Sequence, residues 1–205
     1  MIEFAKLIHA AIGTDSSWSV AITFALIAAA LFGLLGWMVN AAYISSLPRF
    51  DIRMDSANFG APGPPYDPNK YTLVVLVVSV SNSRSQSIAK DWNLFVKTPA
   101  KEFKRATPVP MGETLELKSS DPGSTKIYRQ ENALYLNTAT KPIQPGDGVT
   151  GVLPYLVEDT TISELARPET TFRLTAVDAF GKEHENVKTR AQFVSEIHFP
   201  VIKDR

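Results

Sequence analysis

The sequence predicts a mainly β protein, an immunoglobulin-like β-sandwich that is preceded by a single transmembrane α-helix. Three observations lead to this prediction. Residues 20–39 contain no charge, residues 71–82 read YTLVVLVVSVSN, and short runs of alternating apolar residues follow, separated by turn-forming residues. The chain has 205 residues, and the roughly 155 that remain after one span suffice for one domain with its own core.

The uncharged segment has the length of a membrane span. About 20 residues at about 1.5 Å per residue form a helix about 30 Å long, which matches the hydrocarbon core of a bilayer. We predict a transmembrane helix over residues 16–44, with Trp18, Trp37 and Tyr43 as anchors at the membrane interface. A cleaved signal peptide is the alternative, but its apolar core is usually only about 7 to 15 residues long.

Small side chains recur every four residues along this segment, where another helix could approach closely. We therefore predict a helix-packing interface made of Ala21, Ala25, Ala29, Gly33 and Trp37. The alternative is chance, because Ala and Gly are common in membrane-spanning helices.

Residues 1–15 predict a short amphipathic helix at the membrane surface. Its apolar residues Phe4, Leu7, Ile8 and Ala11 share one helical face. A disordered leader is the alternative. Residues 45–205 form the predicted extramembrane domain, which begins so soon after Tyr43 that we expect it close to the membrane.

The first part of the domain alternates strand and loop. Residues 48–55 have an apolar side chain at every second position, which predicts a half-buried strand. Residues 56–70 hold four prolines and predict a long loop. Long loops are often functional or disordered, so this one is either a partner-docking segment, with Pro62, Pro64, Pro65 and Tyr66 as candidate residues, or a plain connection.

The stretch YTLVVLVVSVSN is too short for a spanning helix and rich in Val, which favours an extended backbone. Apolar side chains point to both faces of this strand, so both faces need cover. The cover of the outer face is the Pro-rich loop, a short helix or another protein. We expect a segment of the same chain, and we place this strand at the centre of a sheet.

Further strands are predicted over residues 92–97, 113–117, 149–157 and 170–177, with a turn at 178–181 leading into a partner strand from Lys182 onward. Residues 191–201 alternate and predict an edge strand. A single helix is expected in the domain, where Thr161 and Glu164 have the spacing of a capping box.

The composition and motifs argue against most chemistry. The formal net charge is +0, which disfavours nucleic acid as a partner, and Cys is absent. His9, His184 and His198 lack the spacing of a zinc site, and residues 183–185 (Glu-His-Glu) read as a solvated hairpin tip. Ser87 and Lys90 match S-x-x-K outside a helix, and the usual phosphate-binding and nucleophile motifs are missing from the sequence. We therefore expect no catalytic residue, no metal and no cofactor.

Three motifs, SIAKDW (87–92), QENALYLNT (130–138) and DAFGK (178–182), resemble uncharacterised bacterial single-span membrane proteins that have a C-terminal β-sandwich. The resemblance brings no known activity. The expected function is that of a non-catalytic, membrane-anchored accessory or structural subunit of a larger membrane protein complex, for example photosynthetic or respiratory. Its expected partners are membrane protein subunits and the bilayer. The alternative is a membrane-tethered module that binds a ligand or peptide.

The expected location is a bacterial inner membrane. Basic residues lie on both sides of the span, with Lys6 before it and Arg49 and Arg53 after it, so their count does not decide the orientation. We expect a cytoplasmic N-terminus and a periplasmic domain, with a cytoplasmic domain as the alternative.

Overall fold

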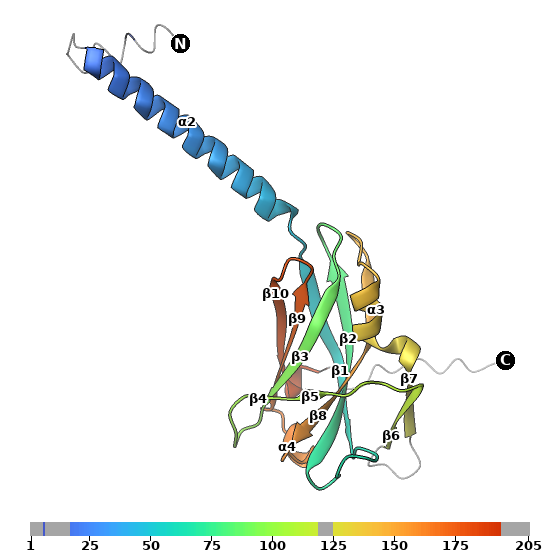
Figure 1. Cartoon of the computed structure of the whole chain (residues 1–205). Helices are drawn as coiled ribbons and strands as arrows, with labels where there is room; N and C mark the ends of the chain where they lie inside the picture. Colours follow the sequence, from blue (N-terminus) through green and yellow to red (C-terminus); the bar gives the residue numbers. More distant parts are fainter. Residues whose placement is uncertain (1–5, 7–16, 119–124, 194–205) are drawn as a thin grey trace, which may run out of the picture. The chain divides into compact units, whose positions relative to one another are not determined.

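A computed structural model of the chain describes residue 6, residues 17–118 and residues 125–193 (Figure 1). The chain divides between Leu47 and Pro48 into two compact units. Apart from Lys6, the predicted amphipathic segment 1–15 lies outside the described residues, as does the predicted edge strand beyond Phe193.

The first unit contains one long helix, α2 (Ser17–Ser46). Residues Val20–Ser46 are apolar and long enough to cross a membrane, although a signal sequence has the same properties. The helix continues two residues beyond the predicted end at residue 44. Its last hydroxyls, those of Ser45 and Ser46, donate to the carbonyls of Ala42 and Tyr43. The helix stops there because Pro48 disfavours a helical conformation at Leu47.

The second unit contains two four-stranded antiparallel sheets and a separate hairpin (Figure 1). The first sheet has the order β1 (Phe50–Gly60), β2 (Tyr71–Asn82), β8 (Gly148–Glu158), β5 (Thr107–Pro108). The second has the order β10 (Glu183–Thr189), β9 (Thr171–Asp178), β3 (Ala89–Lys97), β4 (Lys104–Arg105). The hairpin pairs β6 (Thr114–Lys118) with β7 (Thr125–Arg129). The prediction of a mainly β sandwich after one apolar helix is confirmed, whereas the immunoglobulin-like class stays a prediction.

The main core lies between the two sheets. It is made of the inward-facing side chains of β1, β2 and β8 on one side and of β3 and β9 on the other, with Met54, Leu76, Leu94, Phe172 and Leu174 fully buried. Along each strand these inward-facing residues alternate with residues on the outer face, because successive side chains of a β-strand point to opposite faces of the sheet. At about 25 cal/mol per Å² of buried apolar surface, this contact is the main stabilising term of the domain.

The outer face of β2 is buried as well, as its sequence predicted. Leu73 and Val75 pack with Met111, Leu117 and Leu156 in a second apolar cluster. The chain therefore covers this face itself. The cover consists mainly of the β6–β7 hairpin and the segment around Met111, and the Pro-rich loop contributes only Tyr66 to this cluster.

Two local predictions were wrong, one on a strand boundary and one on the helix content of the domain. The loop predicted from residue 56 begins only after Gly60, because a bulge at Asp55 lets β1 continue along β2. The domain also has more helix than the one predicted turn. That turn exists as α4 (Ile162–Leu165) with its Thr161–Glu164 capping box, but α3 (Leu134–Thr140) and the 3-10 turns η1 (Gln130–Asn132) and η2 (Arg190–Gln192) were missed.

Candidate functional site

The predicted packing stripe is uncovered along α2. Ala21, Ala25, Ala29 and Gly33 are all exposed, and a Cβ added at Gly33 would meet nothing within 4 Å. Because an α-helix has 3.6 residues per turn, residues spaced by four form a ridge inclined to the axis. The stripe is therefore an inclined ridge of small side chains, the geometry that 4-4 helix packing uses.

The predicted membrane anchors lie at different positions along this helix. Trp18 is in its first turn, outside the side chains that the structure describes, while Trp37 and Tyr43 are 66% and 58% exposed. Trp18 and Trp37 are separated by roughly 28 Å of helix at about 1.5 Å per residue, close to the thickness of a hydrocarbon core. Tyr43 lies further along, near the end of α2.

The candidate docking residues do not form one surface. Pro62 is buried, Pro64 and Pro65 are exposed, and Tyr66 is half-buried against Tyr71, with their ring centroids 6.4 Å apart. The four residues nevertheless share one groove. We call it the outer groove; its volume is about 400 Å³, and its other walls come from the sheet and from the segments around Pro110 and Leu115.

A second hollow, which the sequence did not predict, lies at the edge of the sandwich between β3, β5 and α3. We call it the edge pocket. Its volume is about 420 Å³ and its lining is largely apolar, with Trp92, Tyr135, Leu153, Pro108 and Tyr155 among the lining residues. Three prolines and three aromatic residues from distant segments meet here, so no local sequence pattern could have revealed it.

Two features set the base of the edge pocket. Asp91 has a positive φ of 53° where the register of β3 shifts, and the following Trp92 is turned inward. The Trp92 Nε1–H donates to Thr138 Oγ1 over 3.1 Å, and the Thr138 hydroxyl donates in turn to the Ala89 carbonyl over 2.7 Å. These bonds fix the indole ring between β3 and α3.

The hydroxyl of Tyr155 is buried beside this pocket without a hydrogen-bond partner among the described residues. Burial raises the pKa of the phenol far above its ordinary value, and the nearby Arg105 only partly opposes this shift. The phenol is therefore neutral over the physiological pH range. A buried hydroxyl without a partner is costly to stability.

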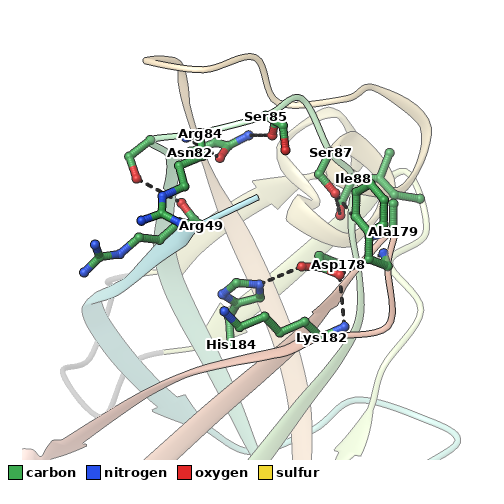
Figure 2. Close-up of polar contacts among 12 residues, drawn as sticks. Arg49, Asn82, Arg84, Ser85, Ser87, Ile88, Asp178, Ala179, Lys182 and His184 are labelled. Atoms are coloured by element: carbon green, nitrogen blue, oxygen red, sulfur yellow. Dashed lines mark hydrogen bonds and ion pairs between the residues drawn. The ribbon is translucent and has the colours of Figure 1, made fainter. Parts of the chain in front are cut away.

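A polar cluster lies at the end of the domain where β9 turns into β10 (Figure 2). The carboxylate of Asp178 is fully buried and accepts hydrogen bonds from the backbone N–H groups of Phe180 and Lys182, over 2.8 and 3.0 Å. Its other oxygen lies 3.0 Å from His184 Nε2. Burial by itself raises the pKa of this carboxyl, but the hydrogen bonds from His184 and the two amides outweigh burial, and its pKa lies below the usual value.

The prediction of a solvated tip at residues 183–185 was therefore wrong for His184. Glu183 and Glu185 are exposed as expected, but the imidazole turns inward, where it packs edge-on against Phe50 with ring centroids 5.1 Å apart. The alternation of side chains along the strand was predictable. The buried partner of His184 was not, because Asp178 lies six residues upstream, on the other side of the turn.

The other chemical candidates stay dispersed. Ser87 is buried and accepts a hydrogen bond from Ala179 N–H, while Lys90 is exposed at the start of β3. Lys104 pairs with Glu158 and Asp159 at the surface. Within residues 17–118 and 125–193, no group of three His, Cys, Asp or Glu side chains is placed to hold a metal ion.

The fold and these hollows define a β-sandwich domain that follows one apolar helix. Neither a family model nor a curated protein matches the sequence. The likeness to solved structures is distant, and no family is shown. The apolar helix and β domain are compatible with the layout of the single-span proteins that the sequence resembles.

Solved structures that resemble the fold include three proteins. The first is the lipoprotein candidate ycdA of Bacillus subtilis, with 11% identity and a TM-score of 0.38. The match covers 72% of this chain but only 38% of the Bacillus protein. The second is a protein of Bordetella pertussis assigned as ApaA, with 12% identity, a TM-score of 0.30, and 70% and 96% of the two chains covered. A structural genomics target has 10% identity, a TM-score of 0.26 and coverage of 76% and 96%. At these values the likenesses carry no argument about function.

Proposed function

We propose that this protein is a membrane-anchored, non-catalytic accessory or structural subunit of a larger membrane protein complex. In this proposal α2 crosses the bilayer, its small-residue ridge packs against a helix of another subunit, and the β-sandwich contacts the extramembrane part of that complex. Photosynthetic and respiratory assemblies are examples of such complexes. We place the domain on the periplasmic side of a bacterial inner membrane.

One observation carries the proposal, namely that the apolar helix is left uncovered by the residues that the structure describes. None of the most apolar stretch of Val20–Ser46 is buried, and Phe32 and Val39 are 74% and 69% exposed. An apolar surface of this size in water promotes aggregation, whereas lipid or another subunit would cover it. The exposed ridge of small residues supports a helical partner on one side.

Extraction of the native membranes tests this proposal. Alkaline washing should leave the full-length chain in the membrane pellet, and mild detergent should release it in one large, stable assembly whose mass exceeds that of the monomer. Intact mass spectrometry of the extracted chain checks that residues 1–46 are retained. A mature chain that begins after residue 40, or a free monomer in every mild detergent, would contradict the proposal.

The second candidate function is that of a tethered binding module, and the outer groove favours it. The groove is formed partly by Pro64, Pro65 and Tyr66, which are accessible at the end of the domain where β1 leads into β2. A ligand that binds the folded domain raises its melting temperature. Proline-rich peptides, glycans and lipid headgroups should be screened by thermal shift on the purified chain, and a shift that Leu115→Glu abolishes but Leu136→Glu preserves would favour this function.

A further inference from the structure

The strand register gathers four segments at one end of the β domain. Phe50 pairs with Asn82, Ser81 pairs with Gly148, and Ala89 pairs with Asp178. The segments 47–49, 83–88, 141–148 and 178–183 therefore lie together, and we call them the linker end. The backbone bonds between Ser83 N and Arg49 O and between Ile143 N and Ser87 O hold three of them directly to one another.

The turn between β9 and β10, within the linker end, is held by several hydrogen bonds. Gly181 N–H donates to the Asp178 carbonyl, and Gly181 has a φ of +83°, which glycine adopts without strain. The buried carboxylate of Asp178 then ties down the two amides inside and after the turn, as Figure 2 shows for Lys182. This network fixes the backbone of the turn although its outer side chains reach into solvent.

The side chain that this turn presents is apolar. Phe180 occupies the third position of the turn and is 59% exposed. A fixed turn at a domain surface needs no large aromatic ring at this position, because polar residues and glycine satisfy such turns. Phe, like Trp and Leu, is a typical residue of apolar surfaces that enter the boundary between the headgroups and acyl chains of a bilayer.

The exposed charge of the linker end is positive. Its exposed charged residues are basic at Arg49, Arg84, Lys141 and Lys182 and acidic at Asp147 and Glu183, a net charge of +2 that the buried Asp178 carboxylate reduces to +1. A basic surface with an apolar tip is the combination that binds a membrane containing anionic lipids.

The covalent chain keeps this end near α2. Only residues 47, 48 and 49 separate Ser46 from Phe50, and four steps of about 3.8 Å limit the distance between these two Cα atoms to about 15 Å. This bound on the distance between Ser46 and Phe50 holds for every orientation of the two units.

We propose that the linker end contacts the membrane surface, with Phe180 inserted among the lipid headgroups and Arg49, Arg84 and Lys182 facing anionic phosphates. This inference rests on the proposed membrane anchor. It adds a second attachment point, which restricts the orientation of the sandwich above the bilayer. The ligand class is an anionic phospholipid surface.

Site-specific fluorescence on the full-length chain tests the proposal, because the sequence contains no Cys. Single variants Ala179→Cys, Asn69→Cys and Leu34→Cys are labelled with the environment-sensitive dye NBD and placed in nanodiscs of phosphatidylcholine and phosphatidylglycerol. The label at 179 should be blue-shifted and quenched by lipids that carry a nitroxide near the headgroup. The label at 69, at the opposite end of the domain, should show neither effect.

The label at Leu34 separates the two proposals. Quenching of the Leu34 label by lipids with a nitroxide deep in the acyl chains shows that the helix spans the bilayer. If the label at 179 then shows no blue shift and no quenching, as expected for the label at 69, the proposed surface contact is wrong. If the label at Leu34 is not quenched, the anchor itself is wrong.

A second substitution tests the role of the ring. Phe180→Ser in the Ala179→Cys background should return the NBD emission to its value in water. Val187→Ser removes a comparably exposed apolar side chain from β10 and should leave the emission unchanged. Nanodiscs of phosphatidylcholine alone should reduce the blue shift, and an equal shift in both lipids would overturn the electrostatic part of the proposal.

Discussion

The carboxylate of Asp178 and the imidazole of His184 face each other across the β9–β10 turn, with 3.0 Å between Oδ2 and Nε2 and side-chain exposures of 0% and 7%. Each group is buried because the other satisfies it. Removal of one partner would leave a buried charge or donor without a hydrogen bond. The free-energy cost of such an unpaired buried group exceeds the net stabilisation that the intact pair provides.

Asp178→Ala should therefore destabilise the domain strongly. The substitution leaves two backbone amides and His184 without their acceptor, and we expect a loss of about 2 to 4 kcal/mol in the free energy of unfolding. Asp178→Asn keeps the shape and should cost less. Chemical denaturation of the detergent-solubilised chain measures both, and the exposed neighbour Glu183→Gln should stay within about 0.5 kcal/mol of wild type.

The same carboxylate should make the stability depend on pH. Its pKa in the folded protein lies below the ordinary value of 3.8 for this carboxyl, so its ionised form stabilises the fold at pH values above about 4, where the unfolded chain is also ionised. This contribution is lost as the pH falls through the lower, folded pKa. The stability difference between wild type and Asp178→Asn should therefore shrink below pH 3.8 in melting experiments, and a constant difference would contradict the assigned ionisation.

Thr138→Val should destabilise the contact between α3 and β3. Valine has nearly the same shape, but it leaves the buried Trp92 Nε1–H without its acceptor, at a cost of about 1 to 3 kcal/mol. Thr140 belongs to the same helix and is exposed, so Thr140→Val is the matched control. Equal melting temperatures for the two variants would show that the Trp92 bond does not hold α3 in place.

Gly151→Ala should also destabilise the domain. A Cβ at this position of β8 would lie 2.6 Å from the Asn132 carbonyl oxygen and 3.0 Å from Leu134, and overpacking against backbone typically costs about 1 to 3 kcal/mol. Gly112→Ala, where an added Cβ meets nothing within 4 Å, serves as the control. The melting temperature should fall for the first variant only.

Leucine at Ala25, Ala29 and Gly33 should release the protein from its complex, because the larger side chains prevent the close approach of a second helix. Leucine at Ala42 adds bulk about 100° or more around the helix from all three positions and should leave the assembly intact. Co-purification and native mass analysis distinguish the triple variant from this control. Retained association of the first would refute the ridge as an interface.

The double-faced strand shows how much of the fold the sequence could predict. Val74 and Leu76 on one face and Leu73 and Val75 on the other required cover on both sides, and the structure provides it. The identity of the outer cover could not be predicted, because the β6–β7 hairpin reaches it through contacts far apart in the chain. The helix α3 was missed because its two threonines have low helix propensity, and tertiary contacts such as the Trp92–Thr138 bond hold it in place.

The candidate sites divide in the same way. The docking residues Pro62 to Tyr66 were chosen from composition, and they do line a groove, whereas the edge pocket joins residues from β3, β5, β8 and α3 that no spacing relates. His184 was assigned to solvent as part of a predicted hairpin tip at residues 183–185. Its burial depends on Asp178 across the turn and on Phe50 from another strand.

The sequence by itself determined the apolar helix, the mainly β domain and the turn at residues 178–181, because each depends on local periodicity, chain length or turn chemistry. Only the tertiary structure decided what covers β2, where the two hollows form and which charged groups are buried. These features depend on contacts between residues distant in the chain, and the free energy of such contacts is set by packing and desolvation rather than by local pattern.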